Sequence, residues 1–203
     1  MARTLRLEAE GGIYHVLNRG NYRADVFADE GTCEAFLHCL GEACERTEWV
    51  VHAWCIMSNH YHLAVETPQA NLVEGMRWLQ GTFSTRFNRL RRESGHLFQE
   101  RYKSLIVDPF EGLGPLCHYI HLNAVRAGLC GVDQLAGWPW TSVKWLMQPR
   151  RRAPWYRAEA ALQHAGGLSD TADSISPAAW LCASKPDKVR IHIARTPAVL
   201  AAT

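Results

Sequence analysis

Several features that would point to particular protein classes are absent from this chain of 203 residues. It has no apolar run long enough to span a bilayer, and Met1 to Arg6 lack the apolar core of a signal peptide. The seven cysteines form no Cys-x-x-Cys pair, which argues against a disulfide framework or a zinc site and favours reduced thiols. Internal repeats and low-complexity segments are absent too. We therefore expect a cytoplasmic protein that does not enter a membrane.

The composition predicts an ordinary folded domain. Apolar residues make up 47% of the chain, which argues against wholesale disorder, and the length allows one domain with a core plus an appendage. The formal net charge is only +2, so the chain as a whole is not a polycation. Composition therefore leaves the function open, and the informative signals are short motifs.

His60-Tyr61-His62 is the most informative of these motifs, because it lies in a run that is typical of a β-strand. Side chains alternate between the two faces of a strand, so both histidines point to one side and Tyr61 to the other. Neutral imidazole is the commonest metal ligand in proteins, and two on a rigid strand suit a divalent cation. Taken alone, however, a His-x-His triplet more often consists of surface or packed histidines.

A second motif lies on a predicted helix over residues 116–128, which Gly128 would end. Tyr119 and Asn123 are four residues apart on this helix and therefore share a face. A phenol beside an amide oxygen could pair a nucleophile with a metal ligand. The simpler interpretation is that Tyr119 packs under the sheet while Asn123 serves as a cap. The presence of the histidine pair favours the nucleophile and metal-ligand interpretation instead.

Together the two motifs resemble those of the single-tyrosine HUH transposases, and more closely those of the REP-associated tyrosine transposases. Five blocks carry the resemblance, in the family's order, over roughly residues 1–145: 12–21 (GIYHVLNRGN), 54–63 (WCIMSNHYHL), 95–104 (GHLFQERYKS), 119–128 (YIHLNAVRAG) and 138–142 (WPWTS). Two positions depart from the family pattern. Tyr61 replaces an aliphatic residue, and Ala124 stands where proline is common. Neither change removes a catalytic atom.

The resemblance implies an enzyme that cleaves and rejoins single-stranded DNA, and the substrate it implies is a REP-like hairpin. Tyr119 would be the nucleophile and would keep the 5′ phosphate as a phosphotyrosine. His60, His62 and Asn123 would hold a divalent metal ion, either Mg²⁺ or Mn²⁺. The expected partner is single-stranded DNA, the expected assembly a monomer or homodimer, and the expected location the bacterial nucleoid. A C-terminal segment helps to hold the hairpin in family members.

The basic residues that could contact phosphates fall into clusters. Such clusters are usually only solvated, but beside a nuclease site they would bind DNA with an affinity that falls as salt rises. The candidates are Arg86, Arg89, Arg91, Arg92, Arg101, Lys103, Arg150, Arg151 and Arg152.

Other residues compete for these roles. Tyr102 is a rival nucleophile, although it has no ligand-type residue four positions further on, and Glu66 is a rival metal ligand. His118 and His121 would point to either side of Tyr119, toward solvent or phosphate. Two predicted strands contain single histidines that would be ordinary core residues: His15 and His52.

Two other functions stay open. A non-catalytic module that binds single-stranded nucleic acid on a ferredoxin-like sheet would need neither metal nor nucleophile. A metal-dependent hydrolase of small phosphates is less consistent with the sequence, because carboxylates are lacking near the histidine pair.

The predicted fold is α+β, an HUH-type split βαβ (ferredoxin-like) antiparallel sheet with helices mainly on one face. The expected elements alternate as strand, helix, strand, strand, helix, strand: 13–18, 29–46, 49–57, 60–67, a long helix capped by Asn71, and 102–107. The transposase-like domain would span residues 1–148. Residues 149–203 would form a C-terminal extension with a short helix within 155–165, possible DNA contacts and a disordered end.

Overall fold

A four-stranded antiparallel sheet forms the centre of the molecule, with strand order β2-β3-β1-β4. The computed structural model describes residues 7–168 and residue 170. The strands are β1 (Gly12–Arg19), β2 (Val50–Ile56), β3 (His60–Thr67) and β4 (Lys103–Val107). Their positions and the order of elements confirm the predicted split βαβ arrangement.

The β2–β3 hairpin brings His60 and His62 to their positions. Ser58 and Asn59 make the turn, and the Met57 amide donates to the His60 carbonyl at 2.8 Å. In this register Cys55 pairs with His62 and Ile56 with Tyr61. The predicted antiparallel return of the histidine strand is therefore confirmed.

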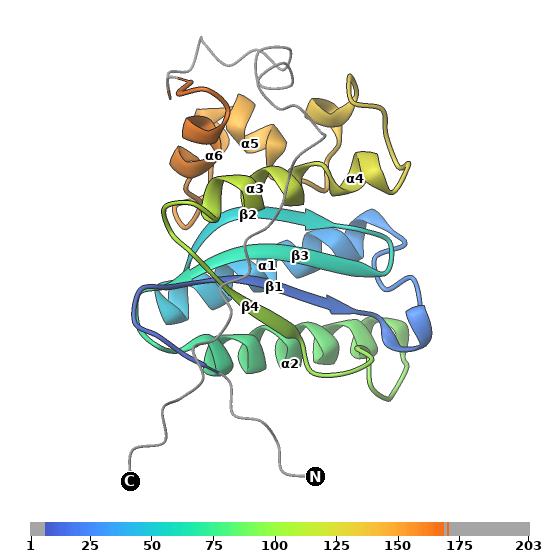
Figure 1. Ribbon diagram of the computed structural model, residues 1–203. Helices are drawn as coiled ribbons and strands as arrows, with labels where there is room; N and C mark the ends of the chain where they lie inside the picture. The colour runs from blue at the N-terminus through green and yellow to red at the C-terminus, as the bar shows by residue number, and fades with distance from the viewer. Residues whose placement is uncertain (1–6, 169, 171–203) are drawn as a thin grey trace, which may run out of the picture.

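Helices α1 (Glu30–Thr47) and α2 (Leu72–Arg91) pack against each other and cover one face of the sheet (Figure 1). Asp29 caps α1, since its side chain accepts a hydrogen bond from the Thr32 amide at 2.8 Å. Aromatic rings fill the space between these helices and the sheet, and they contact one another at centroid distances of 4.6–6.3 Å: Phe27, Phe36, Tyr61 and Phe83. This layer is the main core.

Two details of α2 differ from the prediction. Asn71 stands at the cap position, but its side chain instead accepts from Trp49 Nε1 and donates to the Thr47 carbonyl, which ties the ends of α1 and α2 together. Leu90, expected in the apolar stripe, is 75% exposed because it lies at the end of the helix, beyond the sheet.

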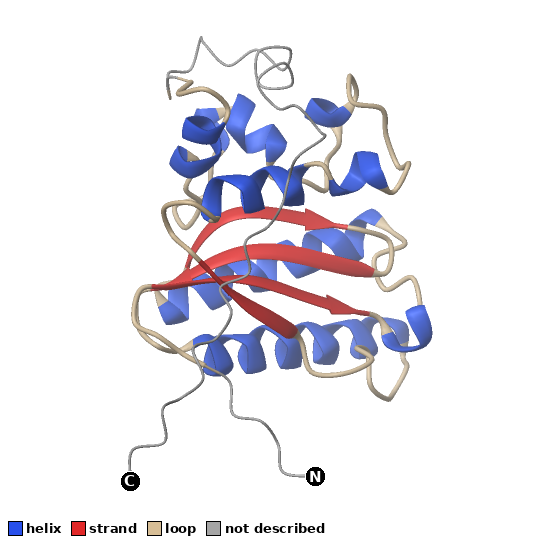
Figure 2. Ribbon diagram, viewed as in Figure 1, coloured by secondary structure: helices blue, strands red, loops and turns tan. Residues whose placement is uncertain are grey.

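The helices after β4 lie along the β2 edge of the sheet (Figure 2). They are α3 (Leu113–His121), α4 (Asn123–Arg126), α5 (Val143–Met147) and α6 (Glu159–His164), with short 3-10 turns η2 (Leu135–Gly137) and η3 (Pro149–Arg151). Helix α3 contacts β2 and β3 on the face opposite α1 and α2. The predicted continuous helix to Gly128 is interrupted at Leu122, so Tyr119 and Asn123 lie on two helical segments.

The described part of the C-terminal extension packs on the domain. Val51 in β2 donates to the Trp155 carbonyl and accepts from the Arg157 amide, both at 2.9 Å, and α6 packs on α3. The predicted short helix is therefore present, although shorter. The division at residue 148 stays a prediction, and the expected disordered end lies outside the described residues.

Six cysteines fall within the described residues, and all six have free thiols. Within this part of the chain, no helix is long and apolar enough to cross a membrane.

Candidate active site

The face of the sheet opposite α1 and α2 carries the histidines, and we call it the histidine face. Strand pairing sets out its side chains in rows, because residues paired directly across two strands point to the same side. One row joins Arg19 to His60, and the next joins Leu17 to His62 and Lys103. Helix α3 covers the β2–β3 half of this face. The β1–β4 half stays open to solvent, where Arg19, Lys103 and Leu105 are exposed.

A third histidine, His15, lies beside His62. The two rings stack with centroids 5.2 Å apart, and His15 Nε2 lies 2.9 Å from His62 Nδ1 in a buried hydrogen bond. Burial lowers the pKa of His62 to about 3 and that of His15 to about 4, so both rings are neutral at pH 7. This contact engages Nδ1 of His62 and leaves Nε2 for a ligand.

His60 is held in the same manner. Its Nδ1 lies 2.7 Å from Asn59 Oδ1, and its ring centroid is 5.1 Å from that of His62. Burial lowers its pKa, and the positive charge of Arg19 lowers it further. Both members of the pair are therefore neutral and oriented through Nδ1, which is the condition that imidazole must meet to bind a metal ion.

Tyr119 reaches this cluster from α3. Its ring centroid lies 5.8 Å from His15 and 6.0 Å from His62, in both cases edge to face. The Arg126 guanidinium lies over the Tyr119 ring, 4.8 Å from the ring centroid. The phenol is only partly buried, so a substrate can reach it from solvent.

Asn123 is the first residue of helix α4. It is 9% exposed, and its Nδ2 has no hydrogen-bond partner within the described residues. The next residue, Ala124, hydrogen-bonds through its backbone to Cys55, which pairs with His62 in the sheet. The unpartnered Nδ2 is a hydrogen-bond donor, so it fits an acceptor supplied from outside the chain, such as a phosphate oxygen, and a metal ion would have to bind Oδ1 instead. The neutral His60 and His62 are suitable ligands for a divalent ion, whereas no three His, Cys, Asp or Glu side chains within the described residues form a metal-binding group.

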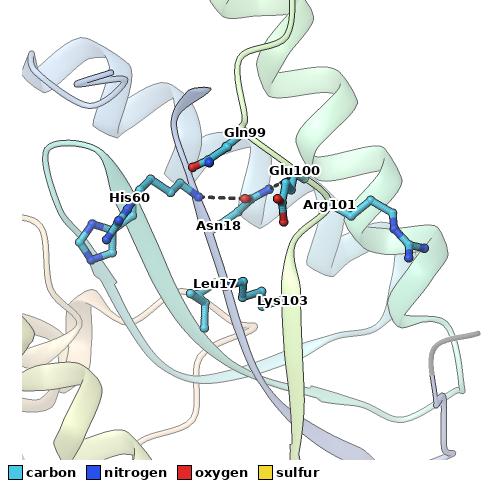
Figure 3. Close-up of a pocket in the computed structure, with 8 residues that line it drawn as sticks. Leu17, Asn18, His60, Gln99, Glu100, Arg101 and Lys103 are labelled. Carbon is cyan, nitrogen blue, oxygen red and sulfur yellow. Dashed lines mark hydrogen bonds between the residues drawn. The ribbon is translucent and has the colours of Figure 1, made fainter. Parts of the chain in front are cut away.

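A pocket of about 230 Å³ adjoins His60 on the open side of the sheet (Figure 3). Its floor is held by Asn18, which donates to the Glu100 carbonyl at 3.0 Å and accepts from the Arg19 amide at 2.8 Å. The remaining lining comes from the ends of β1 and β4 and the segment before β4: Leu17, Arg19, Gln99, Glu100, Arg101 and Lys103. Three of these side chains are cationic, so the pocket suits a negatively charged ligand.

The sequence carries the pattern of a transposase family, since a family model described as IS200-like transposase matches residues 9–123, more than half of the chain. The chain belongs to the IS200-like transposase family. The matched segment includes the histidine pair and Tyr119 and ends at Asn123. A search of curated proteins found no match.

Two solved structures resemble this IS200-like transposase to different degrees. One is a REP-associated tyrosine transposase bound to a REP hairpin, which is 15% identical, with a TM-score of 0.61 over 79% of this chain and 93% of that one. A putative transposase from Deinococcus radiodurans is 19% identical, with a TM-score of 0.41 over 64% of this chain and 91% of that one. The first similarity confirms the predicted α+β fold.

The predicted DNA contacts of the transposase fall in three places. Arg101 and Lys103 line the pocket beside His60. The cluster at Arg86, Arg89, Arg91 and Arg92 lies at the end of α2, in the layer on the other side of the sheet, where Arg86 pairs with Glu42 and Arg91 with Asp29. Arg150 and Arg151 are in η3, and Arg152 pairs with Asp170. Among the predicted DNA contacts, Arg101 and Lys103 are therefore the two that the structure places beside His60.

Several of the rival residues are buried or paired with side chains outside the candidate site. Tyr102 precedes Lys103 and is buried, with its side chain on the opposite side of β4 from Lys103 by strand alternation. Glu66 pairs with His52 at 2.8 Å. The expectation that His118 and His121 face solvent or phosphate is wrong, because they are 4% and 0% exposed. His121 lies 2.8 Å from Ser142 Oγ, in the segment that covers α3.

Three residues of the site were missed from the sequence. His15 was expected to be an ordinary core histidine, and Arg19 and Arg126 were not considered. Each joins the site through a contact that sequence alone does not reveal, namely the β1–β3 register for His15 and Arg19 and the bend at Leu122 for Arg126. The available signal was the alternation that puts His15 and Arg19 on one side of β1.

Proposed function

We propose that this IS200-like transposase cleaves and rejoins single-stranded DNA with Tyr119 as the nucleophile. The observation that carries the proposal is the approach of the Tyr119 ring to within 6.0 Å of the His62 ring, across the gap between α3 and β3. A phenol approaches two neutral imidazoles, one of which, His60, lines a cationic pocket, and we propose that the Asn123 amide completes the site. That combination serves phosphodiester cleavage, and it has no evident use in a protein that only binds nucleic acid.

His60, His62 and Asn123 would hold a divalent metal ion. Mn²⁺ accepts imidazole ligands more readily than Mg²⁺, which prefers oxygen ligands. When bound, the ion would act as a Lewis acid that polarises the scissile phosphate. Two neighbouring residues would orient the histidines for this role, since Asn59 hydrogen-bonds Nδ1 of His60 and His15 hydrogen-bonds Nδ1 of His62.

Tyr119 performs the covalent step. Its Oη forms a bond to the phosphorus atom while the bond from phosphorus to the 3′ oxygen breaks. The phenolic proton passes to solvent water, and the departing 3′ oxygen takes a proton from water. The product is a 5′-phosphotyrosine and a free 3′ hydroxyl, which can attack in reverse and rejoin a strand without a nucleotide cofactor. Arg126 and Arg19 supply positive charge near the ring and the histidines, where it offsets charge on the phosphate oxygens.

The substrate would be a single strand that crosses the open β1–β4 half of the histidine face. A single strand can present a splayed backbone to Tyr119 and its phosphates to Arg101 and Lys103, while a duplex is too wide and rigid to do so. A similar fold is bound to a REP hairpin in the REP-associated tyrosine transposase. We therefore propose a hairpin with a single-stranded flank as the substrate, with Arg89, Arg92, Arg150 and Arg151 as further phosphate contacts.

A non-catalytic module for single-stranded nucleic acid is the alternative. The exposed basic half of the sheet favours it, since such a surface binds phosphates without a metal ion or nucleophile. The two functions differ in one respect that can be measured, because only the enzyme forms a covalent bond to DNA.

A labelled hairpin with single-stranded flanks, incubated with the protein and Mn²⁺ or Mg²⁺, tests the proposal. We expect an adduct stable in SDS, and its complete loss in Tyr119→Phe, which removes one oxygen and little volume. Tyr102→Phe is the matched control and should form the adduct as the wild type does. If Tyr102→Phe lost the adduct and Tyr119→Phe kept it, the assignment of Tyr119 as the nucleophile would be wrong. Binding without any adduct would favour the non-catalytic module.

A further inference from the structure

The connection after β1 holds an aromatic side chain out into solvent. Tyr22 and Arg23, in turn η1 (Asn21–Arg23), have φ angles of 50° and 60°, in the left-handed region that residues with a Cβ seldom adopt. The Tyr22 side chain is 93% exposed. Two consecutive strained residues and a fully exposed ring persist only where the surrounding structure holds them, and such strain concentrates at functional sites.

Hydrogen bonds attach this turn to the active site. The Gly20 amide donates to the Asn59 carbonyl at 2.8 Å, and the Asn59 side chain donates to the Arg23 carbonyl at 3.4 Å. Asn59 also orients His60 through its Oδ1. The turn that carries Tyr22 is therefore fixed to the residue beside the histidine pair.

The pocket beside His60 begins only three residues before Tyr22. Arg19 lines the pocket, and its carbonyl accepts from the amide of Gln99, another lining residue, at 3.0 Å. The Asn21 amide in turn donates to the Leu97 carbonyl at 2.9 Å. The turn and the wall of the pocket thus form one hydrogen-bonded unit, with the cationic lining of the pocket on one part and the exposed Tyr22 ring on another.

We propose that Tyr22 is a stacking platform for one base of a single-stranded nucleic acid whose phosphates lie in the pocket beside His60. This inference rests on the proposed function, and it adds a binding subsite outside the catalytic cluster. Bases stack on aromatic side chains regardless of sequence, and cationic grooves track the backbone, so the two features together fit an unpaired strand. The subsite holds the strand next to the phosphate that Tyr119 attacks.

Phe110 provides a matched comparison. It is also 93% exposed, but it lies between β4 and α3, after the end of β4 that pairs with the start of β1, and thus at the opposite end of the sheet from His60. Asp108 accepts hydrogen bonds from the Phe110 and Glu111 amides, so the surroundings of this ring are acidic. Exposure alone would make the two rings equivalent, whereas the proposal assigns a role to Tyr22 only.

The test measures the affinity of the full-length protein for a hairpin with a single-stranded flank. Tyr22→Ala should weaken binding about 5- to 100-fold, the range for one stacked base, while Tyr22→Phe keeps the ring and should bind as the wild type does. Phe110→Ala should also bind as the wild type does. The slope of log affinity against log salt should stay unchanged in Tyr22→Ala and should decrease by about 1 in Arg101→Gln, which removes a phosphate contact.

A series of oligonucleotides with one abasic position each identifies the stacked base. At one position of the flank, removing the base should weaken binding by the wild type and have no further effect on Tyr22→Ala. The proposal is overturned if Tyr22→Ala binds as tightly as the wild type, if it weakens binding no more than Phe110→Ala does, or if no abasic position loses its effect in that variant. None of these results depends on an adduct, so failure of the cleavage chemistry is distinguishable from failure of the subsite.

Discussion

The two faces of the sheet differ in what they bury. On the face toward α1 and α2, aromatic rings seal the core, and the phenol of Tyr61 accepts a hydrogen bond from Gln80 at 2.8 Å. On the histidine face, imidazoles occupy the centre and helix α3 covers only half of the surface. Consecutive residues of β3 therefore serve opposite purposes, since Tyr61 completes the core while His60 and His62 build the site.

This difference shows how a strand can carry the proposed catalytic groups without weakening the fold. Alternation separates the residues that stabilise from those that react, so the aromatic layer holds β3 rigid behind the histidines. Tyr61 fills a position where the family usually has an aliphatic residue. Burial raises the pKa of its phenol, so it is not a competing nucleophile.

Neighbouring substitutions in β3 should have opposite effects, and this is the largest expected contrast. His60→Ala should reduce cleavage by about 10³-fold or more, because a proposed metal ligand is lost, while leaving DNA binding nearly unchanged. Tyr61→Phe should lower the free energy of unfolding by about 1 kcal/mol through loss of the Gln80 hydrogen bond and leave cleavage intact.

Cleavage rates, DNA affinity and urea unfolding of both variants provide the measurement. If Tyr61→Phe lost cleavage as completely as His60→Ala, the two faces would not be functionally separate. Full activity of the wild type in excess chelator would remove the metal ion from the proposed mechanism.

A smaller effect is expected at His15, which acts through His62. His15→Leu removes the partner of His62 Nδ1 and should raise the Mn²⁺ concentration for half-maximal binding about 10- to 100-fold. His15→Gln offers an amide oxygen near the position of Nε2 and should recover most of the affinity. Titration of Mn²⁺ by electron paramagnetic resonance measures this directly, without reference to activity. Equal metal affinity in His15→Leu and the wild type would leave His15 as a core residue only.

Much of this arrangement could be predicted from the sequence. Alternation and the Ser58-Asn59 turn define the hairpin, and the apolar spacing of α2 places most of its buried residues. The role of His15 was not predictable, because it depends on pairing between strands 47 residues apart in sequence.

Other parts depended on the packing of distant segments. His118 and His121 are buried because residues near 142 and 164 fold back over α3, which no local pattern indicates. The break at Leu122 likewise has no helix-breaking residue in this segment to announce it, and the residue that follows Asn123, Ala124, hydrogen-bonds through its backbone to Cys55 in β2. These contacts decide which side chains the helix presents to the sheet.

The smallest expected effect concerns pH and the helix that covers the histidine face. Burial lowers the pKa of His121 to about 3, below its value of 6.5 in the unfolded chain. Protonation then favours unfolding, so the contribution of His121 to stability is constant above about pH 7 and falls as the pH decreases from 6.5 toward 3. His121→Asn should reduce this slope by up to about 1.4 kcal/mol per pH unit. Urea unfolding at pH 7, 6 and 5 tests it, and equal slopes in both proteins would contradict the assignment.

The most direct test of the central claim is to identify the residue that becomes attached to DNA. Protein incubated with hairpin DNA and Mn²⁺ would be treated with nuclease and trypsin, and the peptides analysed by mass spectrometry. Cleavage after Lys103 and Arg126 releases a peptide whose only tyrosine is Tyr119, separate from the one that contains Tyr102. We predict a residual 5′-phosphonucleotide on Tyr119. A nucleotide on Tyr102, or cleaved DNA without any covalently modified peptide, would contradict the account.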